Sequence, residues 1–226
     1  MRIGHFIPAY RQDCHIEVAM DMVRGVSWLG TTDYHGAELV PFWVDATGIA
    51  RARNLAVDLA YKHEFDALLM QDADCFTPGP SSSLERLFGD LMVYNVAVAG
   101  AAIAIRNGNG MNCDPALPGE VYEGDVGTGL MMIDLRRLRN LPRPWFVHRD
   151  APDGLSVARS EDIYFCQHVR AHGHSVLVDY SFPTGHASTG VVGTAPPAAT
   201  GVHSKADDGP NGRHGDADLR AGKRRD

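Results

Sequence analysis

A short apolar run that ends in two carboxylates constrains the fold of this chain more than any other stretch. Residues 67–70 read Ala-Leu-Leu-Met, and Asp72 and Asp74 follow within four positions. An apolar run this short, bounded by polar residues, predicts a buried strand. In an open α/β sheet, ligands bind in the crevice beyond the carboxyl ends of the strands. The two acids are therefore predicted to stand where such a sheet holds its ligand.

The spacing of Asp72 and Asp74 adds a chemical prediction. Residues i and i+2 of an extended backbone point to one side, so both carboxylates are expected to face the same place. Mg²⁺ and Mn²⁺ prefer oxygen ligands and commonly hold a substrate diphosphate through one or two carboxylates. The pair therefore indicates a metal and nucleotide site. On this motif alone, a solvated turn that contains two acids remains the commoner explanation.

The composition allows one domain of ordinary size. The chain has 226 residues, of which 44% are hydrophobic and 22% charged, enough to build one core. Its net charge of -7 argues against a general nucleic-acid binder, because such binding depends on clustered Lys and Arg. The cysteines form no Cys-x-x-Cys pair, so neither a structural zinc site nor a disulfide framework is indicated. They are Cys14, Cys75, Cys113 and Cys166.

The sequence contains no pattern that predicts secretion or membrane insertion. Met1 and Arg2 lead directly into an apolar stretch with no cleavage-like sequence, so no signal peptide is predicted. The longest apolar region, residues 91–105, is shorter than the ~20 residues of a spanning helix and contains Asn95. We expect a soluble, cytoplasmic protein, from a bacterial cell or encoded by a phage in its host.

Apolar runs and helical periodicity alternate along the first third of the chain. Strands are predicted at residues 2–8, 39–44 and 67–70, with helices at 16–26 and 47–63 between them. The first helix has Ile16, Met20 and Val23 at helical spacing. Such alternation predicts a mostly parallel sheet flanked by helices, that is, an α/β fold.

The remaining chain continues this pattern and then loses it. Helices are predicted at residues 81–91 and 160–172, strands at 96–105, 130–134 and 175–179, and an irregular loop at 106–123. Residues 190–226 contain almost nothing that can enter a core and are predicted to be a disordered tail. The prediction is one Rossmann-like domain, residues 1–189, followed by that tail.

Two arginines lie near the start of the second predicted helix, where acidic residues are usually favoured. A helix N-terminus favours acids, yet Arg51 and Arg53 occupy its first turns. This small cost suggests that they serve an anion such as a diphosphate, which arginine binds well. Two solvated surface arginines explain the pattern equally well. Asn54 and Asp58 share the polar face of Arg51.

Two later motifs are candidates for close contact and for proton transfer. Gly127, Thr128 and Gly129 precede a predicted strand, where glycines let the backbone approach a ligand closely or form a bulge. Asp162 shares a helix face with the apolar positions 165, 166 and 169, so it is expected to look inward. Partial burial would raise the pKa of its carboxyl group towards the range that suits a general base. Glu161 precedes it.

Taken in order, these motifs resemble those of the GT-A fold glycosyltransferases, specifically the family 2-like group of inverting, metal-dependent enzymes that use nucleotide-sugar donors. The likeness covers residues 1–189 and is carried by four stretches. They are Ile-Ala-Arg-Ala-Arg-Asn at 49–54, Leu-Met-Gln-Asp-Ala-Asp at 69–74, Gly-Thr-Gly-Leu-Met-Met-Ile-Asp at 127–134, and Ser-Glu-Asp at 160–162 with the later Gly185-His186.

The resemblance implies a role for each matching residue. Asp74 would bind Mn²⁺ or Mg²⁺ directly, Asp72 would contact the donor ribose or the metal through water, and His186 would complete the metal shell. The Glu161-Asp162 pair would hold the catalytic base, with Asp162 as that base. The donor would be bordered by Pro8, Ala9, Tyr10, Arg51, Arg53, Asn54, Asp72, Gly127, Thr128 and Gly129.

The implied reaction is a single displacement at the anomeric carbon of a UDP- or GDP-sugar. The acceptor stays open among a glycan, a protein, a lipid and a modified nucleic-acid base, and Asp45 is a weak candidate for an acid that reads uracil. A nucleotidyltransferase is one alternative, although no Gly-rich, Lys-containing phosphate loop follows the first strand. A non-catalytic protein that binds nucleotide-sugars or glycans on the same fold is another, and a purely structural interaction protein is the weakest.

Overall fold

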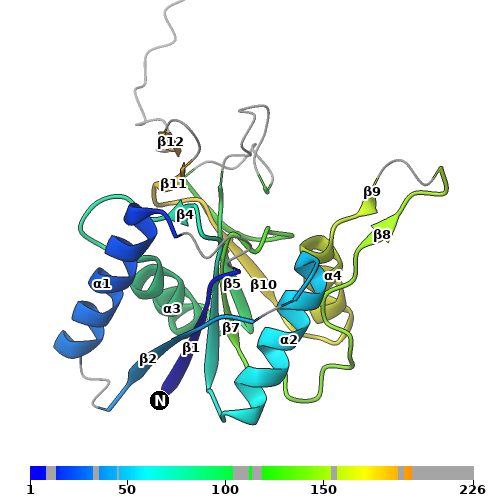
Figure 1. Cartoon of the computed structure of the whole chain (residues 1–226), viewed down its shortest axis with the longest axis horizontal. Helices are drawn as coiled ribbons and strands as arrows, with labels where there is room; N and C mark the ends of the chain where they lie inside the picture. Colours follow the sequence, from blue (N-terminus) through cyan, green and yellow to red (C-terminus); the bar gives the residue numbers. More distant parts are fainter. Residues whose placement is uncertain are drawn as a thin grey trace, which may run out of the picture.

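A seven-stranded mixed sheet forms the centre of the molecule (Figure 1). The computed structural model describes residues 1–8, 14–32, 36–44, 46–103, 112–113, 119–153, 157–187 and 191–194. The strands lie in the order β2-β1-β3-β7-β5-β10-β6. Their bounds are β1 Arg2–Phe6, β2 Glu38–Phe42, β3 Ala67–Gln71, β5 Val98–Ala101, β6 Val121–Glu123, β7 Leu130–Asp134 and β10 Val176–Asp179.

The sheet is mainly parallel, as the alternation of strands and helices predicts. Strands β2, β1, β3, β5 and β10 share one direction, because β7 runs antiparallel to both β3 and β5. Strand β6 also runs against its neighbour β10. The carboxyl ends of the five strands therefore meet at one edge, opposite the labelled N-terminus in Figure 1. The predicted α/β class is confirmed.

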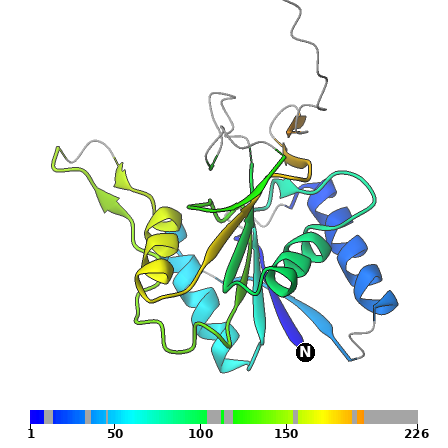
Figure 2. The same cartoon turned by 180° about the vertical axis from the view of Figure 1, so that it is seen from behind.

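Two helices cover each face of the sheet. Helices α1 (Ile16–Thr31) and α3 (Ser83–Val93) lie on one face, and α2 (Ile49–Lys62) and α4 (Glu161–Ala171) on the other (Figures 1 and 2). The strands alternate between two cores, so Leu68 packs on the α2 side and Leu69 on the α1 side. None of the four helices in the described part of the chain is long and apolar enough to cross a membrane.

Short strands outside the main sheet were not predicted from the sequence. Strands β4 (Cys75–Phe76), β11 (Thr184–Ala187) and β12 (Val191–Thr194) form a small sheet at the edge where the parallel strands end. Strands β8 (Arg149–Asp150) and β9 (Val157–Arg159) form a ribbon that projects from the body (Figure 1). Strand β12 lies within the predicted tail, of which residues 195–226 fall outside the described chain.

Helix α1 presents the opposite face from the one that its apolar spacing suggests. Ile16, Met20 and Val23 are 65%, 47% and 61% exposed. The buried positions are Val18, Asp21, Gly25 and Leu29. Gly25 allows close packing, because a Cβ atom there would lie 3.2 Å from Leu84 Cβ of α3. The packing of Gly25 on α3 and the hydrogen bonds to Asp21 fix the orientation of the helix. The apolar side chains of Ile16, Met20 and Val23 are left exposed as a result.

Candidate functional site

The two acids after β3 are held in a tight backbone turn. All five residues of β3 are buried, and the Asp72 amide then donates to the Gly129 carbonyl at 2.9 Å. The Cys75 amide donates to the Asp72 carbonyl at 3.0 Å and starts β4. The side chains of Asp72 and Asp74 are 34% and 17% exposed. The acids therefore stand at the carboxyl edge of the sheet, as predicted, in an ordered turn.

Asp74 lies within a cluster of three side chains that can hold a cation. His186 Nε2 is 3.2 Å from Asp74 Oδ2, and His186 pairs with Cys75 in the ladder between β4 and β11. One ligand atom each from Asp74, Cys75 and His186 lies within 4.8 Å of the others. A carboxylate, an imidazole and a thiol at this separation fit a divalent cation. Asp74 and His186 come together as predicted, but Cys75 takes the third place that the sequence assigns to Asp72.

Arg53 joins the acid turn to helix α4. Its side chain is 5% exposed and lies 3.2 Å from Asp72 Oδ1 through Nη2. Its other terminal nitrogen contacts Glu161 Oε1, and the Glu161 side chain is 8% exposed. Arg53 therefore fixes the Glu161 carboxylate beside the acid turn. The catalytic part predicted for Glu161 stays a prediction.

Asp162 stands beside this ion pair at the rim of α4. It is partly exposed, and its Oδ1 accepts from the Ser160 hydroxyl and, at 2.8 Å, from the Ile163 amide. Its Oδ2 would lie 3.2 Å from a Cβ atom on Gly127. Burial raises the pKa of Cys166 to about 12, and the charges of Asp125 and Asp162 add to this rise. Asp162 therefore borders the apolar face, as predicted, with one carboxylate oxygen turned towards residue 127.

Residues 127–129 pass between Asp162 and the acid turn. A Cβ atom on Gly129 would lie 3.0 Å from Cys75 Sγ and 3.6 Å from Asp72 Oδ2. Both glycines are thus required for close approach of backbone and side chains. Thr128, between them, is 1% exposed, and its hydroxyl has no hydrogen-bond partner among the residues that the structure describes. This segment connects the proposed base to the cation cluster.

The side chain of Asn54 links helix α2 to residues 145–146 through hydrogen bonds. Its amide nitrogen donates to the carbonyl oxygens of Ala50 and Phe146 at 2.9 and 2.7 Å. Its amide oxygen accepts from the amides of Trp145 and Phe146 at 2.9 and 3.2 Å. Two donors and two acceptors are the full capacity of an amide side chain. The Asn54 side chain is therefore saturated by hydrogen bonds within the chain, and its predicted contact with the donor stays a prediction.

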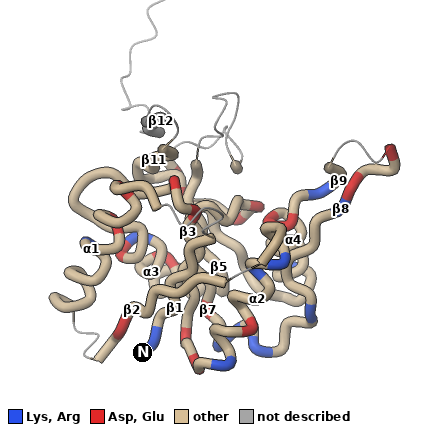
Figure 3. The backbone as a smooth tube through the Cα atoms, viewed as in Figure 1, with Lys and Arg blue, Asp and Glu red and all other residues tan. Residues whose placement is uncertain are grey.

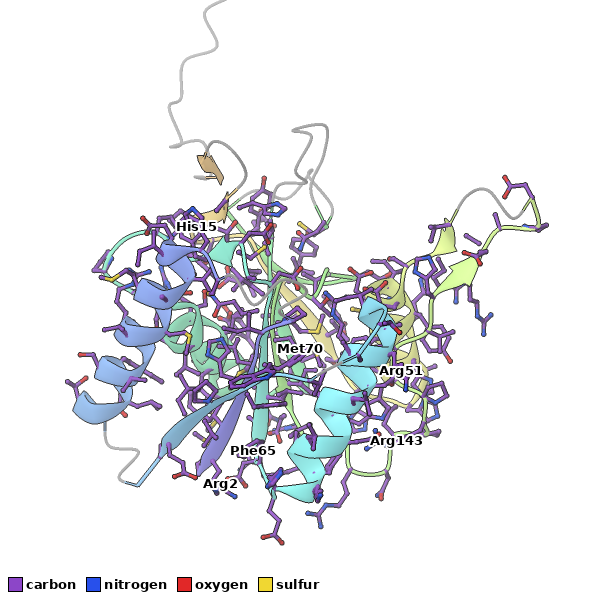
Figure 4. The ribbon with its side chains drawn as sticks, in the orientation of Figure 1. Arg2, His15, Arg51, Phe65, Met70 and Arg143 are labelled. Carbon is purple, nitrogen blue, oxygen red and sulfur yellow. The ribbon has the colours of Figure 1, made fainter. Side chains whose placement is uncertain are left out.

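The other predicted donor residues are Arg51, Pro8, Ala9, Tyr10 and the weak candidate Asp45. Arg51 is exposed and lines a shallow groove of about 550 Å³ along α2, together with Arg143 (Figure 4) and His148. Pro8 is buried just beyond the end of β1. Ala9, Tyr10 and Asp45 fall outside the described residues.

A buried polar network behind the acid turn has no counterpart in the sequence predictions. Gln71 joins His5 Nε2 at 2.8 Å to Asp21 Oδ2 at 3.0 Å, and its amide nitrogen also donates to the Cys75 carbonyl at 2.8 Å. Asp21 accepts from the Ser83 amide at 2.9 Å. Burial lowers the pKa of His5 to about 4, against a smaller opposing effect of Gln71. The network fixes the turn from below, and the only local sign of it is the polar Gln71 at the end of an apolar run.

His148 was also missed, because no local pattern marks it. Its Nδ1 lies 3.5 Å from Glu161 Oε2, and its side chain is 42% exposed. It immediately precedes the β8–β9 ribbon, which carries both charge signs (Figure 3), including Arg149, Asp150 and Arg159. The ribbon therefore starts at the edge of the candidate site.

Comparison with known proteins identifies the fold and no family. No family model matches the chain, and no curated protein matches it. Among solved structures, the chain is similar to A197 from STIV, with a TM-score of 0.55 and 17% identity. The match covers 83% of this chain and 86% of that one. At this identity the likeness supports the α/β fold alone.

Proposed function

We propose that the chain is a metal-dependent, inverting glycosyltransferase that takes a sugar from a nucleoside-diphosphate donor. The observation that carries the proposal is the convergence of four separate segments on one edge of the sheet. The acid turn, the start of α4, the glycine segment at 127–129 and His186 of β11 are joined by direct contacts. Ordinary folding does not require acids, a buried arginine and an imidazole to meet there.

The proposal divides the binding work among these side chains. Asp74 and His186 would hold a divalent cation, and a cation bound there would neutralise the charge that develops on a leaving diphosphate. Asp72, held in place by Arg53, faces the donor ribose. The glycines at 127 and 129 let Asp162 and the acid turn approach this backbone closely, and the Thr128 hydroxyl offers the donor a hydrogen bond.

Asp162 is assigned the proton transfer. Its Oδ1 is fixed by Ser160 and the Ile163 amide, while Oδ2 is turned towards Gly127. The acceptor oxygen forms a bond to the anomeric carbon as the bond from that carbon to the diphosphate oxygen breaks. The acceptor proton passes to Asp162, and the anomeric configuration inverts.

A panel of UDP-, GDP- and dTDP-sugars with Mn²⁺ tests the proposal, with donor hydrolysis and thermal stabilisation as readouts. At least one donor should be hydrolysed and should raise the melting temperature only when metal is present. Asp74→Asn should lose both effects. Glu38→Gln is the matched control, because Glu38 pairs with Arg2 at the opposite edge of the sheet.

The same panel separates the competing functions. Stabilisation by a nucleotide-sugar without any turnover, even with a range of acceptors, would identify a non-catalytic binding protein. Release of pyrophosphate from nucleoside triphosphates would identify a nucleotidyltransferase. No response to any nucleotide would overturn the proposal.

A further inference from the structure

Cys75 is the least expected member of the cation cluster. It directly follows Asp74 and begins β4, whose ladder with β11 places Cys75 opposite His186 and Phe76 opposite Gly185. Directly opposite residues of an antiparallel pair project from the same face, and successive residues alternate faces. A Cβ atom on Gly185 would touch the Phe76 ring at 2.4 Å, so this second pair occupies the other face. Cys75 and His186 therefore share one face.

The sulfur atom lies where the acids and the glycine segment meet. Cys75 Sγ is 3.8 Å from Asp74 Oδ1 and would lie 3.0 Å from a Cβ atom on Gly129. The residue is 2% exposed, although His186 and Asp74 beside it reach the surface. One edge of the cluster is therefore open to a ligand, and the thiol forms its inner wall.

We propose that Cys75 binds the cation directly, as a thiolate, so that the centre is Asp74–Cys75–His186 and prefers Zn²⁺ or Co²⁺ to Mg²⁺. Thiolate sulfur and imidazole select borderline cations, whereas Mg²⁺ takes oxygen ligands and retains water. The thiol proton is released to solvent when the metal–sulfur bond forms. This departs from the Mn²⁺ or Mg²⁺ that the family resemblance implies.

A set of three protein ligands also suits a catalytic role. Catalytic zinc sites keep three protein ligands and leave a fourth position for water or substrate. The open edge at Asp74 and His186 provides that position. The assignment of a diphosphate oxygen to this fourth position rests on the proposed function; the three protein ligands do not. With Cys75 as a metal ligand, Asp72 pairs with Arg53 and faces the donor.

Titration of the full chain with Co²⁺ tests the inference without any nucleotide. The wild type should show near-ultraviolet thiolate-to-Co²⁺ charge-transfer absorption, and Cys75→Ser should lose it. Cys75→Ser should also weaken Zn²⁺ binding by at least about 10-fold. Mutation of a residue that only hydrogen-bonds to a metal ligand already lowers metal affinity by about that factor. Mg²⁺ binding should stay unchanged. Cys14→Ser is the matched control, because Cys14 is an exposed thiol outside the cluster.

Wild-type protein provides a measurement that does not depend on folding of a variant. X-ray absorption at the zinc edge of the Zn²⁺-loaded chain should show one sulfur neighbour at about 2.3 Å. A shell of nitrogen and oxygen alone, or an unchanged Co²⁺ spectrum in Cys75→Ser, would overturn the inference. A sulfur-ligated metal in a chain that ignores every nucleotide-sugar would uphold it while removing the proposed function.

Discussion

Arg53 is a buried charge that joins two elements of the candidate site. It is buried between Asp72 and Glu161, two acids that lie far apart in the sequence and on different elements. The bridge to Glu161 is buried and contributes little net free energy, since desolvation offsets the attraction between the charges, whereas Asp72 is 34% exposed. Removing Arg53 is different, because the Glu161 carboxylate, 8% exposed, then loses the counter-charge that offsets its burial.

Arg53→Met should lower the free energy of unfolding by about 3–5 kcal/mol, because the buried Glu161 carboxylate loses its arginine and keeps the exposed His148 at 3.5 Å beside it. Adding Glu161→Gln to this variant should recover part of the loss. Urea unfolding of the two single variants and the double variant measures the coupling. Arg51→Met, at an exposed position on the same helix, should change stability by less than about 0.5 kcal/mol. Strict additivity of the two buried changes would contradict this account of Arg53.

Asp162→Asn should abolish sugar transfer while leaving the affinity for the donor within about twofold. The amide preserves the size of the side chain and an oxygen that accepts from Ser160 and the Ile163 amide, but it cannot take the acceptor proton. Single-turnover assays and donor titrations separate the two effects. Full transfer activity in this variant would exclude Asp162 as the base.

The candidate site could be predicted from the sequence only where a local pattern marks a residue. Asp74 is marked by its position just after an apolar strand, and Asp162 is marked by the periodicity of its helix. The opposite is true of Asn54, whose polar position on α2 does not reveal that residues 145–146 satisfy its amide. Cys75 is invisible as a ligand, because only its pairing with residue 186 brings it to His186.

At the scale of elements, the small sheet of β4, β11 and β12 determines the cation cluster. Strand β4 has only two residues, which is too short for an apolar run or an alternating pattern to predict it. Its pairing with β11 joins positions 75 and 186, and Ala187 then donates its amide to the Asp74 carbonyl at 2.6 Å. The geometry of the cluster therefore depends on how closely these two strands approach.

Gly185→Ala should separate β4 from β11. The added methyl group would meet the buried Phe76 ring at 2.4 to 2.7 Å, and such overpacking costs about 1–3 kcal/mol. Thermal unfolding should show the loss, and Co²⁺ or Zn²⁺ titration should show weaker metal binding. Gly89→Ala on α3 is the control, because no atom lies within 4 Å of its added methyl group. It should stabilise the chain by about 0.4–1 kcal/mol.

The main elements could be predicted more fully than the site, and helix α1 explains the exception. Strands such as β3 are continuous apolar runs, which sequence alone reveals. Helix α1 was oriented wrongly because Ile16, Met20 and Val23 look like a core stripe. Its true contact face contains Asp21, whose carboxylate is satisfied by Gln71 and by residue 83, both distant in sequence.

For the whole molecule, two buried groups make stability depend on pH in opposite directions. His5 has a folded-state pKa of about 4 against the ordinary 6.5, so it opposes folding as the pH falls through that interval. The shift corresponds to about 3 kcal/mol, all lost by pH 4. Burial and the neighbouring Asp179 raise the pKa of Asp90 to about 8 from 3.8, so folding is favoured at low pH and weakened as the pH rises.

These effects oppose each other between pH 4 and 6.5, and only that of Asp90 remains between 6.5 and 8. Asp90→Asn should therefore remove the decline in stability between pH 6.5 and 8, whose slope is at most about 1.4 kcal/mol per pH unit. Below pH 6.5 it should uncover the loss due to His5. Urea unfolding across this range measures both. Glu123→Gln, at an exposed acid, should leave the wild-type profile in place.

The reversed direction of β7 gives the fold an evolutionary freedom. Strand β5 ends at Ala101 and β7 begins at Leu130, and antiparallel pairing puts both points at the same edge of the sheet. Between these points the chain contributes β6 to the sheet and then residues 127–129 to the candidate site. Insertions or deletions there that spare β6 and residues 127–129 would leave the pairing of β5 with β7 in register. Under the proposed function, a lineage of such proteins would vary its acceptor through such changes while the core and the residues assigned to the donor remain constant.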